Sequence, residues 1–201
     1  MRIETNRLII RDLNEADAEA LYKLKNDDQV LTFVPDFLEV DLKPENTVHF
    51  IREFNRLENE QNIEAWRCYA VELKALHVVV GVLCFGKNEL LFEYELGWMM
   101  LGEYSKNGYA SEAAEAFAEY ICEKCALDYL IVIMDVDNPA SFRCAQKAGF
   151  KLFEKRTVYD YCYNRYCDDY YYFRRYSSKC TCRNRFYGDV LYTGRSVNGA
   201  E

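Results

Sequence analysis

The sequence contains little of what would break, cross-link or export a chain. Its 201 residues include 3 prolines and 9 glycines, a composition that excludes collagen-like and low-complexity proteins. No run approaches the roughly 18 apolar residues of a membrane span, and the densest stretch is 78–85. Residues 1–13 alternate charged with apolar side chains and lack the apolar centre of a signal peptide. We therefore expect one cytoplasmic domain without membrane contact.

Cysteine is common, but its pattern does not indicate disulfides or metal binding. The 9 cysteines are odd in number and follow no export signal, so we expect free thiols. Cys122 and Cys125 continue the apolar stripe of a helix, which favours buried structural residues over a redox or metal pair. Cys180 and Cys182 lie in a polar tail without a neighbouring histidine or a further cysteine pair at zinc-finger spacing. The 2 histidines of the chain stand apart from carboxylate motifs, so we predict no metal site.

Charge is distributed unevenly along the chain, whose net charge is -8. Residues 1–150 carry 15 basic and 27 acidic side chains, whereas residues 151–201 carry 10 and 6. An acidic body favours cationic partners such as amines. The basic end holds 10 of the 17 tyrosines within residues 159–192, as would a surface for single-stranded nucleic acid. The alternation over 170–175 better fits a strand with one packed and one solvated face, so we expect no nucleic-acid partner.

The spacing of apolar residues predicts alternating strands and helices. In the first half the expected elements are a strand over 7–13, a helix capped by Asn14, a break around Pro35 and Pro44, a helix over 47–57, and strands over 66–73, 78–85 and 90–100. In the second half they are a helix over 110–126, a strand over 129–136, a short helix from Pro139 that ends before Gly149, and strands over 150–161 and 167–176. Three successive strands predict an antiparallel meander. The strand, helix and strand that follow predict a right-handed crossover, where ligands commonly bind at the start of the helix.

The turn that opens the crossover helix has the properties of an anion site. Gly108 lets the backbone approach a ligand closely, and the small Ala110 does not block it. The free amides at the start of a helix point toward negative charge, which suits phosphate groups. The alternative is an ordinary turn in which Ser111 or Asn107 caps the helix.

Several motifs together resemble one family. They are Glu95-Leu96-Gly97-Trp98, Gly108-Tyr109-Ala110-Ser111-Glu112-Ala113, Asp137-Asn138-Pro139-Ala140-Ser141, Gly149-Phe150, and the opening Glu4-Thr5-Asn6-Arg7-Leu8-Ile9-Ile10-Arg11. Over residues 4–175 the chain resembles the GNAT acetyltransferase superfamily, in the branch that includes the ribosomal-protein N-terminal acetyltransferases. The resemblance implies a mixed α/β (α+β) acyl-CoA N-acyltransferase fold, with a mostly antiparallel central sheet, a parallel βαβ unit at the cofactor site and helices on both faces. It implies one domain over 1–176 and a tail over 177–201.

The same resemblance implies that acetyl-CoA is the cofactor and that the turn at Gly108 holds its pyrophosphate. The family has Arg or Gln at the position of Ser105, so one side-chain contact is missing, and Lys106 offers a replacement charge. Asn138 is expected to cap its helix and to contact the pantetheine arm. The expected cofactor-binding residues are Trp98, Met99, Met100, Leu101, Ser105, Lys106, Asn107, Gly108, Tyr109, Ala110, Ser111, Asn138 and Ser141, the first four through their backbone.

Acetyl transfer needs a neutral amine, a stabilised oxyanion and a proton for the departing thiolate. Glu95 is the candidate base, directly or through a water, because a buried carboxylate gains proton affinity. Its alternative is a solvated or ion-paired strand residue. The tyrosine that protonates the thiolate in much of the family corresponds to Ala145 here, and the resemblance moves this role to Ser141. The alternative for Ser141 is a hydrogen bond to backbone amides of its own helix.

These expectations describe an N-acetyltransferase that moves acetyl from acetyl-CoA to a primary amine by direct attack in a ternary complex. The acceptor is a protein N-terminus, an amino acid or a small amine. Its pocket is expected between residues 34–43, the loop around Asn88, and residues 159–169. The departures at Ser105 and Ala145 leave a non-catalytic acyl-CoA-binding regulator as the alternative. The sequence is compatible with a monomer or a homodimer.

Overall fold

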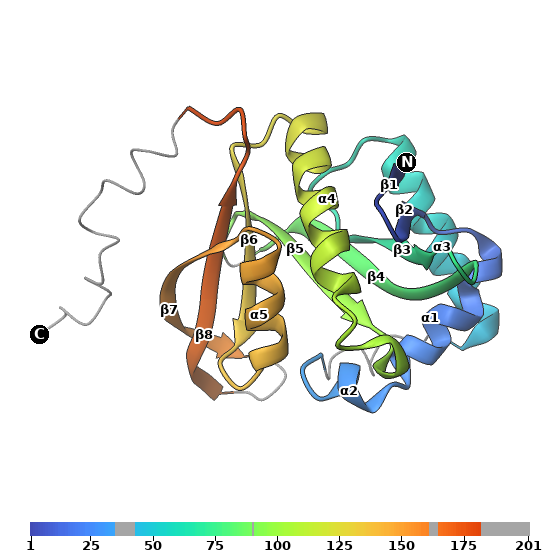
Figure 1. The fold of residues 1–201 in the computed structure, drawn as a ribbon, viewed down its shortest axis with the longest axis horizontal. Coiled ribbons are helices and arrows are strands. Elements are labelled where there is room, and N and C mark those ends of the chain that lie inside the picture. The colour runs from blue at the N-terminus through green and yellow to red at the C-terminus, as the bar shows by residue number, and fades with distance from the viewer. Residues whose placement is uncertain (35–42, 90, 161–164, 182–201) are drawn as a thin grey trace, which may run out of the picture.

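A computed structural model describes residues 1–34, 43–89, 91–160 and 165–181. These residues form an eight-stranded sheet in the order β1-β2-β3-β4-β5-β6-β8-β7 (Figure 1). The strands are β1 (Arg2–Glu4), β2 (Leu8–Asp12), β3 (Arg67–Leu73), β4 (Val78–Lys87), β5 (Tyr94–Met100), β6 (Tyr129–Asp135), β7 (Lys151–Asp160) and β8 (Arg165–Tyr176). The helices are α1 (Ala18–Lys25), α2 (Asp28–Leu31), α3 (Pro44–Asn59), α4 (Tyr109–Lys124) and α5 (Pro139–Lys147), with 3-10 turns η1 (Glu15–Asp17) and η3 (Gly102–Tyr104). Along this part of the chain no helix is both long and apolar enough to span a membrane.

The sheet is antiparallel except at its centre. Strands β3, β4 and β5 form the predicted meander. Strands β5 and β6 then pair in parallel, with Glu95 opposite Ile131, and α4 connects them. The hairpin of β7 and β8 closes the sheet beyond β6. The expected mixed α/β class, with one parallel unit in a mostly antiparallel sheet, is therefore confirmed.

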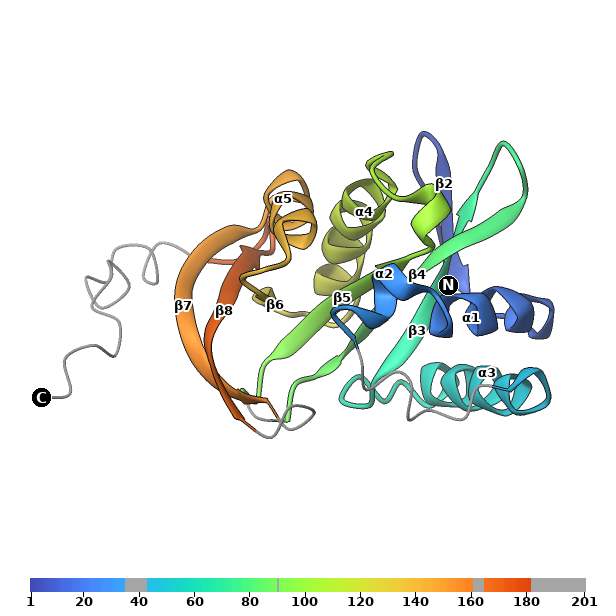
Figure 2. The same cartoon turned by 90° about the horizontal axis from the view of Figure 1, so that it is seen from below.

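Helices cover the two faces of the sheet differently (Figure 2). Helices α4 and α5 lie on one face, and their apolar stripe includes Ala114, Phe117 and Ile121, all buried. Helices α1 and α3 lie on the opposite face, where Leu24 and Ile51 are fully buried. Residues of β3 and β4 therefore contribute to two separate cores, one on each face of the sheet. The helices α1, α2 and α3 gather beside β2 to β5 (Figure 2).

Some element boundaries differ from the prediction for identifiable reasons. Strand β1 and helix α2 were not predicted, because three or four residues are too few to show a periodicity. Pro44 does not break the pattern but starts α3 at its first position, where a fixed φ and a missing amide do no harm. Asn14 caps the turn η1 before α1 begins. Strand β5 starts at Tyr94 instead of residue 90, because residue 91 belongs to a turn and residues 92 and 93 are not in a strand.

The tyrosine-rich strand β8 is packed on both faces. Tyr172 and Phe173 are fully buried and Arg174 is 5% exposed. The prediction of a strand is thus confirmed, but the prediction of a solvated face is wrong at these positions. The reason is that Arg174 pairs with the carboxylate of a glutamate and packs against three aromatic rings. These partners are Glu93, Tyr129, Phe153 and Tyr172. The side chains of residues 156–170 lie outside the described part, as does Cys182.

Candidate active site

The turn between β5 and α4 has the geometry of an anion cradle. Gly108 is the N-cap of α4 with a φ of 79°, and no side chain caps the helix. A methyl group placed at Gly108 would lie 3.6 Å from Arg7 Nη2 and 3.9 Å from Ser111 Oγ, so the backbone is open on this side. Because the first amides of a helix have no partner within it, those of the first turn of α4 can bind an anion. The residues therefore fit a pyrophosphate.

The other polar residues of the turn hold its backbone rather than cap the helix. Asn107 Nδ2 donates to the carbonyl oxygens of Tyr104 and Ser105, each at 3.1 Å. Ser111 Oγ donates to the Gly108 carbonyl at 2.9 Å. Neither Asn107 nor Ser111 caps the helix, so the caps that the ordinary-turn alternative named are not formed. Lys106 is exposed, with a left-handed φ of 64°, and its charge is free to face solvent at the turn.

Arg7 lies against this turn, a position that sequence reasoning did not assign. Its Nη1 donates to the Asn107 carbonyl at 3.0 Å, and its Nε pairs with Glu112 at 2.7 Å. The guanidinium also lies 4.6 Å from the ring centre of Tyr109. Arg7 thus fixes the turn to the start of α4 and places positive charge beside Gly108. No local signal indicates this contact, because about one hundred residues separate Arg7 from Asn107.

Strands β5 and β6 diverge after their single matched pair of residues. Their register contains Glu95 opposite Ile131, and Figure 1 shows the strands running apart toward their carboxyl ends. Trp98, Met99 and Met100 remain paired with β4 on the other side. The edge of β5 that faces the gap can therefore pair with an extended ligand, as the prediction for 98–101 requires.

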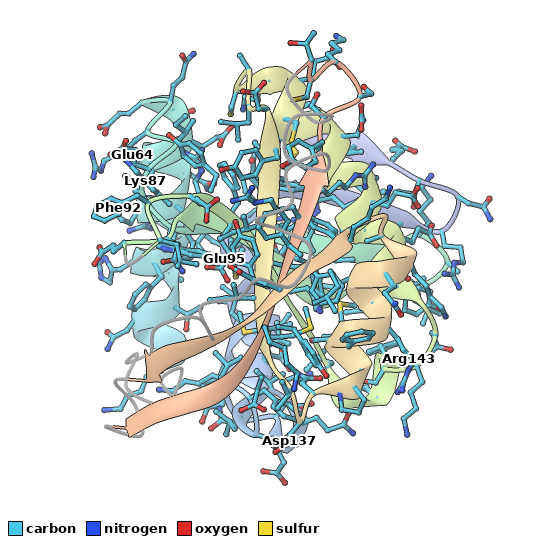
Figure 3. The ribbon with its side chains drawn as sticks, turned by 90° about the vertical axis from the view of Figure 1, so that its left-hand side faces the viewer. Glu64, Lys87, Phe92, Glu95, Asp137 and Arg143 are labelled. Atoms are coloured by element: carbon cyan, nitrogen blue, oxygen red, sulfur yellow. The ribbon has the colours of Figure 1, made fainter. Side chains whose placement is uncertain are left out.

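Glu95 lies at the point of divergence, on the face of the sheet that carries α1 and α3. Its side chain is half-buried, and its Oε2 accepts a hydrogen bond of 2.7 Å from Asn88 Nδ2. Burial raises the pKa of Glu95 to about 7, while hydrogen bonds from Asn88 and from the Ile133 amide oppose this shift. Figure 3 shows Glu95 nearer the centre of the view, with Phe92 and Lys87 toward the edge of the molecule on its left. A carboxyl group poised near neutral pH can exchange a proton with an amine.

Ser141 and Trp98 meet on the opposite face of the gap. Trp98 Nε1 donates to Ser141 Oγ at 3.2 Å, which links β5 to the first turn of α5. Asn138 Oδ1 accepts from the Ser141 amide at 3.0 Å and so caps α5, as predicted. Ser141 Oγ therefore contacts the indole, a partner that the prediction did not foresee. Ala145, where the family tyrosine was expected, is fully buried one turn further along.

A second polar cluster lies near the start of β5. The carboxylate of Glu93 accepts hydrogen bonds from Tyr129 Oη at 2.7 Å and Tyr172 Oη at 2.6 Å. It also forms an ion pair of 2.9 Å with Arg174, whose guanidinium lies 4.1 Å from the ring centre of Phe153. Glu93 is the residue just before β5 begins, and its partner Arg174 pairs in register with Ile131, the residue of β6 that lies opposite Glu95. The cluster therefore lies close to Glu95 across β6.

The described cysteines agree with the expectation of thiols. Cys68, Cys84, Cys122, Cys125 and Cys144 form no disulfide. Cys122 is 3% exposed in the core, which confirms the structural interpretation of that residue. Within the described ranges no group of three or more His, Cys, Asp or Glu side chains is arranged to hold a metal ion. Two expected walls of the acceptor pocket, at residues 35–42 and 161–164, lie outside the described residues.

Comparison with known proteins identifies the family. Residues 7–151 match the family model described as acetyltransferase (GNAT) domain. The chain is 31% identical over 176 residues to the N-acetyltransferase YnaD of Bacillus subtilis, covering 86% of this chain and 95% of that protein. It is 26% identical to YoaA of the same organism, covering 79% and 92%.

Solved structures share the fold. A GNAT-family acetyltransferase from Bacillus anthracis superposes with a TM-score of 0.69 at 27% identity, covering 88% of this chain and 98% of that one. The ribosomal L7/L12 acetyltransferase RimL, solved with coenzyme A, superposes with a TM-score of 0.72 at 18% identity, covering 88% and 98%. This chain belongs to the GNAT acetyltransferase family and is an enzyme of the N-acetyltransferase class.

Proposed function

We propose that the protein transfers acetyl from acetyl-CoA to a primary amine by direct attack in a ternary complex. The observation that carries this proposal is the position of Glu95, whose pKa is about 7, at the divergence of β5 and β6. Acetyl-CoA supplies the activated thioester when it is bound. The uncapped amides that follow Gly108 would hold its pyrophosphate, and the gap-facing edge of β5 would pair with its pantetheine arm. Support for the cofactor also comes from the bound coenzyme A of RimL.

The chain's own residues account for the two proton transfers. Glu95 accepts a proton from the acceptor ammonium, directly or through a water, and leaves a neutral amine as nucleophile. The amine nitrogen forms a bond to the acetyl carbon while the carbon–sulfur bond breaks. Ser141 Oγ would donate a proton at the leaving sulfur and regain one from the amine nitrogen as the amide forms, which restores the hydroxyl. Glu95 and the Ser141–Trp98 pair lie on opposite faces of the gap, which supports a mechanism in which base and acid would act from either side of the reacting bond.

The acceptor belongs to the amines, as a small amine, an amino acid or a protein N-terminus. Support for a peptide acceptor comes from the names of two fold neighbours, RimL and the ribosomal-protein-S5-alanine acetyltransferase of Vibrio fischeri. At 18% and 16% identity these neighbours show a shared fold, so the choice among acceptors rests on the pocket beside Glu95.

A panel of amines and peptides, scored by mass shift and by release of free coenzyme A, tests this function. We expect acetylated product and a heat shift on adding coenzyme A. Glu95→Gln and Ser141→Ala should each slow transfer about 100-fold while the heat shift persists. A heat shift without turnover across the whole panel would instead support a non-catalytic acyl-CoA-binding regulator, and absence of both would reject the proposal.

A further inference from the structure

An open recess lies at the end of the sheet where β3 starts and β4 ends. It has a volume of about 290 Å3 and is lined by Glu64, Ala65, Trp66, Lys87, Glu89 and Phe92; we call it the Trp66 recess. Two of its walls are aromatic rings that the core does not cover, since Trp66 is 39% and Phe92 is 76% exposed. Large exposed aromatic side chains that converge on one hollow are typical of ligand sites.

Gly86 of β4 lies between the recess and Glu95. Glu95 pairs with Gly86 across β4 and β5. A methyl group at Gly86 would lie 2.7 Å from Trp66 Cα and 2.8 Å from Trp66 Cγ, so only glycine lets the indole lie across β4. Trp66 thus stands two strands away from Glu95, about 10 Å between backbones at ordinary strand spacing.

The turn that follows β4 joins the recess to the same carboxyl group. The Phe92 amide donates to the Asn88 carbonyl at 2.8 Å, and the Leu91 amide donates to Asn88 Oδ1 at 2.9 Å. Asn88 Nδ2 in turn donates to Glu95 at 2.7 Å. Asn88 is therefore bonded both to the backbone of Phe92, which lines the recess, and to the carboxyl group of Glu95. Figure 3 shows Glu64, Lys87 and Phe92 grouped together, with Glu95 inward from them.

The charge of the recess favours a cation. Among the described residues that line it, the one basic group is Lys87 Nζ, which forms an ion pair of 2.7 Å with Glu64. The carboxylate of Glu89 adds a negative charge that Lys87 does not balance. The faces of Trp66 and Phe92 attract an ammonium group through their negative quadrupole. A neutral or anionic ligand group would gain neither the attraction to the Glu89 carboxylate nor the cation–π contact with the rings.

We propose that the Trp66 recess binds a second, non-reacting ammonium group of the acceptor, so that the preferred substrate is a linear diamine or polyamine. This inference rests on the proposed acetyl transfer. One amine reaches Glu95 and is acetylated, while the other lies between Trp66 and the carboxylate of Glu89. A chain of several methylene groups spans the interval and packs along the strand surface.

Kinetics with matched acceptors test the proposal. The pairs are butylamine against 1,4-diaminobutane and hexylamine against 1,6-diaminohexane, with spermidine as the longest acceptor. We expect kcat/KM to be about tenfold higher for the diamine of each pair. Glu89→Gln and Phe92→Ser should each raise the diamine KM about fivefold relative to that of the monoamine. Glu115→Gln, which removes an exposed carboxylate on α4, is the matched control and should leave the ratio unchanged.

The outcomes separate the subsite from the reaction. If monoamines and diamines are acetylated equally well, or if the diamine preference survives both recess variants, the subsite is wrong while acetyl transfer stands. If no amine is acetylated, calorimetric titration of 1,6-diaminohexane into the protein saturated with coenzyme A still tests the recess. Binding that weakens about fivefold in Glu89→Gln would support it, and the absence of diamine binding would overturn it.

Discussion

The side-chain amide of Asn88, just before β5, forms hydrogen bonds with both Leu91 and Glu95. Its Oδ1 accepts the Leu91 amide at 2.9 Å, and its Nδ2 donates to Glu95 Oε2 at 2.7 Å. The backbone bond fixes which way the amide points, so the donor necessarily faces the carboxyl group. Asn88 is thus a positioning residue for the proposed base, and it stabilises the ionised form of Glu95 against the effect of burial.

Replacement of Asn88 should move the pH profile of the enzyme. Asn88→Ala removes a hydrogen bond that lowers the pKa of Glu95, so this pKa should rise above 7. The acidic limb of the kcat/KM profile should therefore shift to higher pH, and the rate at pH 7 should fall. Asn88→Asp preserves an acceptor for the Leu91 amide but places a negative charge beside Glu95, so its shift should be larger. Asn59→Ala, at the exposed end of α3, serves as the control. An unmoved limb in both Asn88 variants would contradict the assignment.

Glu95 should also make folding stability depend on pH. The pKa of Glu95 is raised from 4.5 to about 7 in the folded protein. Between these values the folded state binds a proton that the unfolded state has released, so the stability from Glu95 is complete below about pH 4.5 and is lost as the pH rises through 7. Glu95→Gln should abolish this loss. The free energy of unfolding of the variant, relative to that of the parent, should therefore be higher at pH 8 than at pH 5 by up to about 3 kcal/mol. Urea denaturation at several pH values measures the difference. A parallel pH dependence of the variant and the parent would refute it.

The predictable part of the molecule is local. Continuous β-rich runs and helical spacing located the meander, α4 and α5 to within a few residues, because hydrophobic periodicity reports directly on which face of an element is buried. The conformation of the turn at Gly108 was predictable because glycine before a helix has a local backbone consequence, and Gly108 has a φ of 79°. Glu95 was located by its motif, although its partners were not.

The missed contacts all join residues far apart in the chain. Arg7 reaches the turn at Gly108, Trp98 donates to Ser141, and Glu93 pairs with Arg174 across 81 residues. Such contacts depend on strand register and on which strands become neighbours, and neither is encoded in the spacing of apolar residues. The same limit explains the error at β8, whose arginine is buried because β7 and the turn before β5 supply its partners.

The cofactor turn can be tested against a second glycine of the same conformation. Gly108 and Gly149 have φ angles of 79° and 81°, and neither would bring a methyl group closer than 3.6 Å to its neighbours. Alanine at either site should therefore cost a similar stability, about 1 to 2 kcal/mol. Only Gly108→Ala should also reduce the heat shift produced by coenzyme A, about tenfold in affinity, because the methyl group stands where the pyrophosphate is proposed to bind. Equal coenzyme A affinity in the two variants would place the cofactor elsewhere.

The ion pair of Glu93 and Arg174 should be needed for stability. Both side chains are largely buried, with 14% and 6% of their surface exposed. Glu93→Gln removes the carboxylate that pairs with the buried Arg174 guanidinium and should cost about 3 kcal/mol in urea denaturation. Glu119→Gln removes the neighbouring pair with Arg175, in which the carboxylate is 44% exposed, and should cost less than about 1 kcal/mol. If the two substitutions lower the free energy of unfolding by similar amounts, burial does not make the Glu93–Arg174 ion pair more important for stability than the exposed pair.

Ser141 and Asn138 should contribute separable effects although they are hydrogen-bonded to each other. Ser141→Ala removes the hydroxyl that meets Trp98 and should lower kcat about 100-fold with little change in the KM for acetyl-CoA. Asn138→Ala removes the cap of α5, so it should cost about 1 kcal/mol of stability and raise the KM for acetyl-CoA, while the Ser141 hydroxyl stays in place. Steady-state kinetics and thermal unfolding of the two variants distinguish these outcomes. If Ser141→Ala instead lowers stability without lowering kcat, its hydroxyl serves only to join α5 to β5, and the proton for the thiolate comes from another donor.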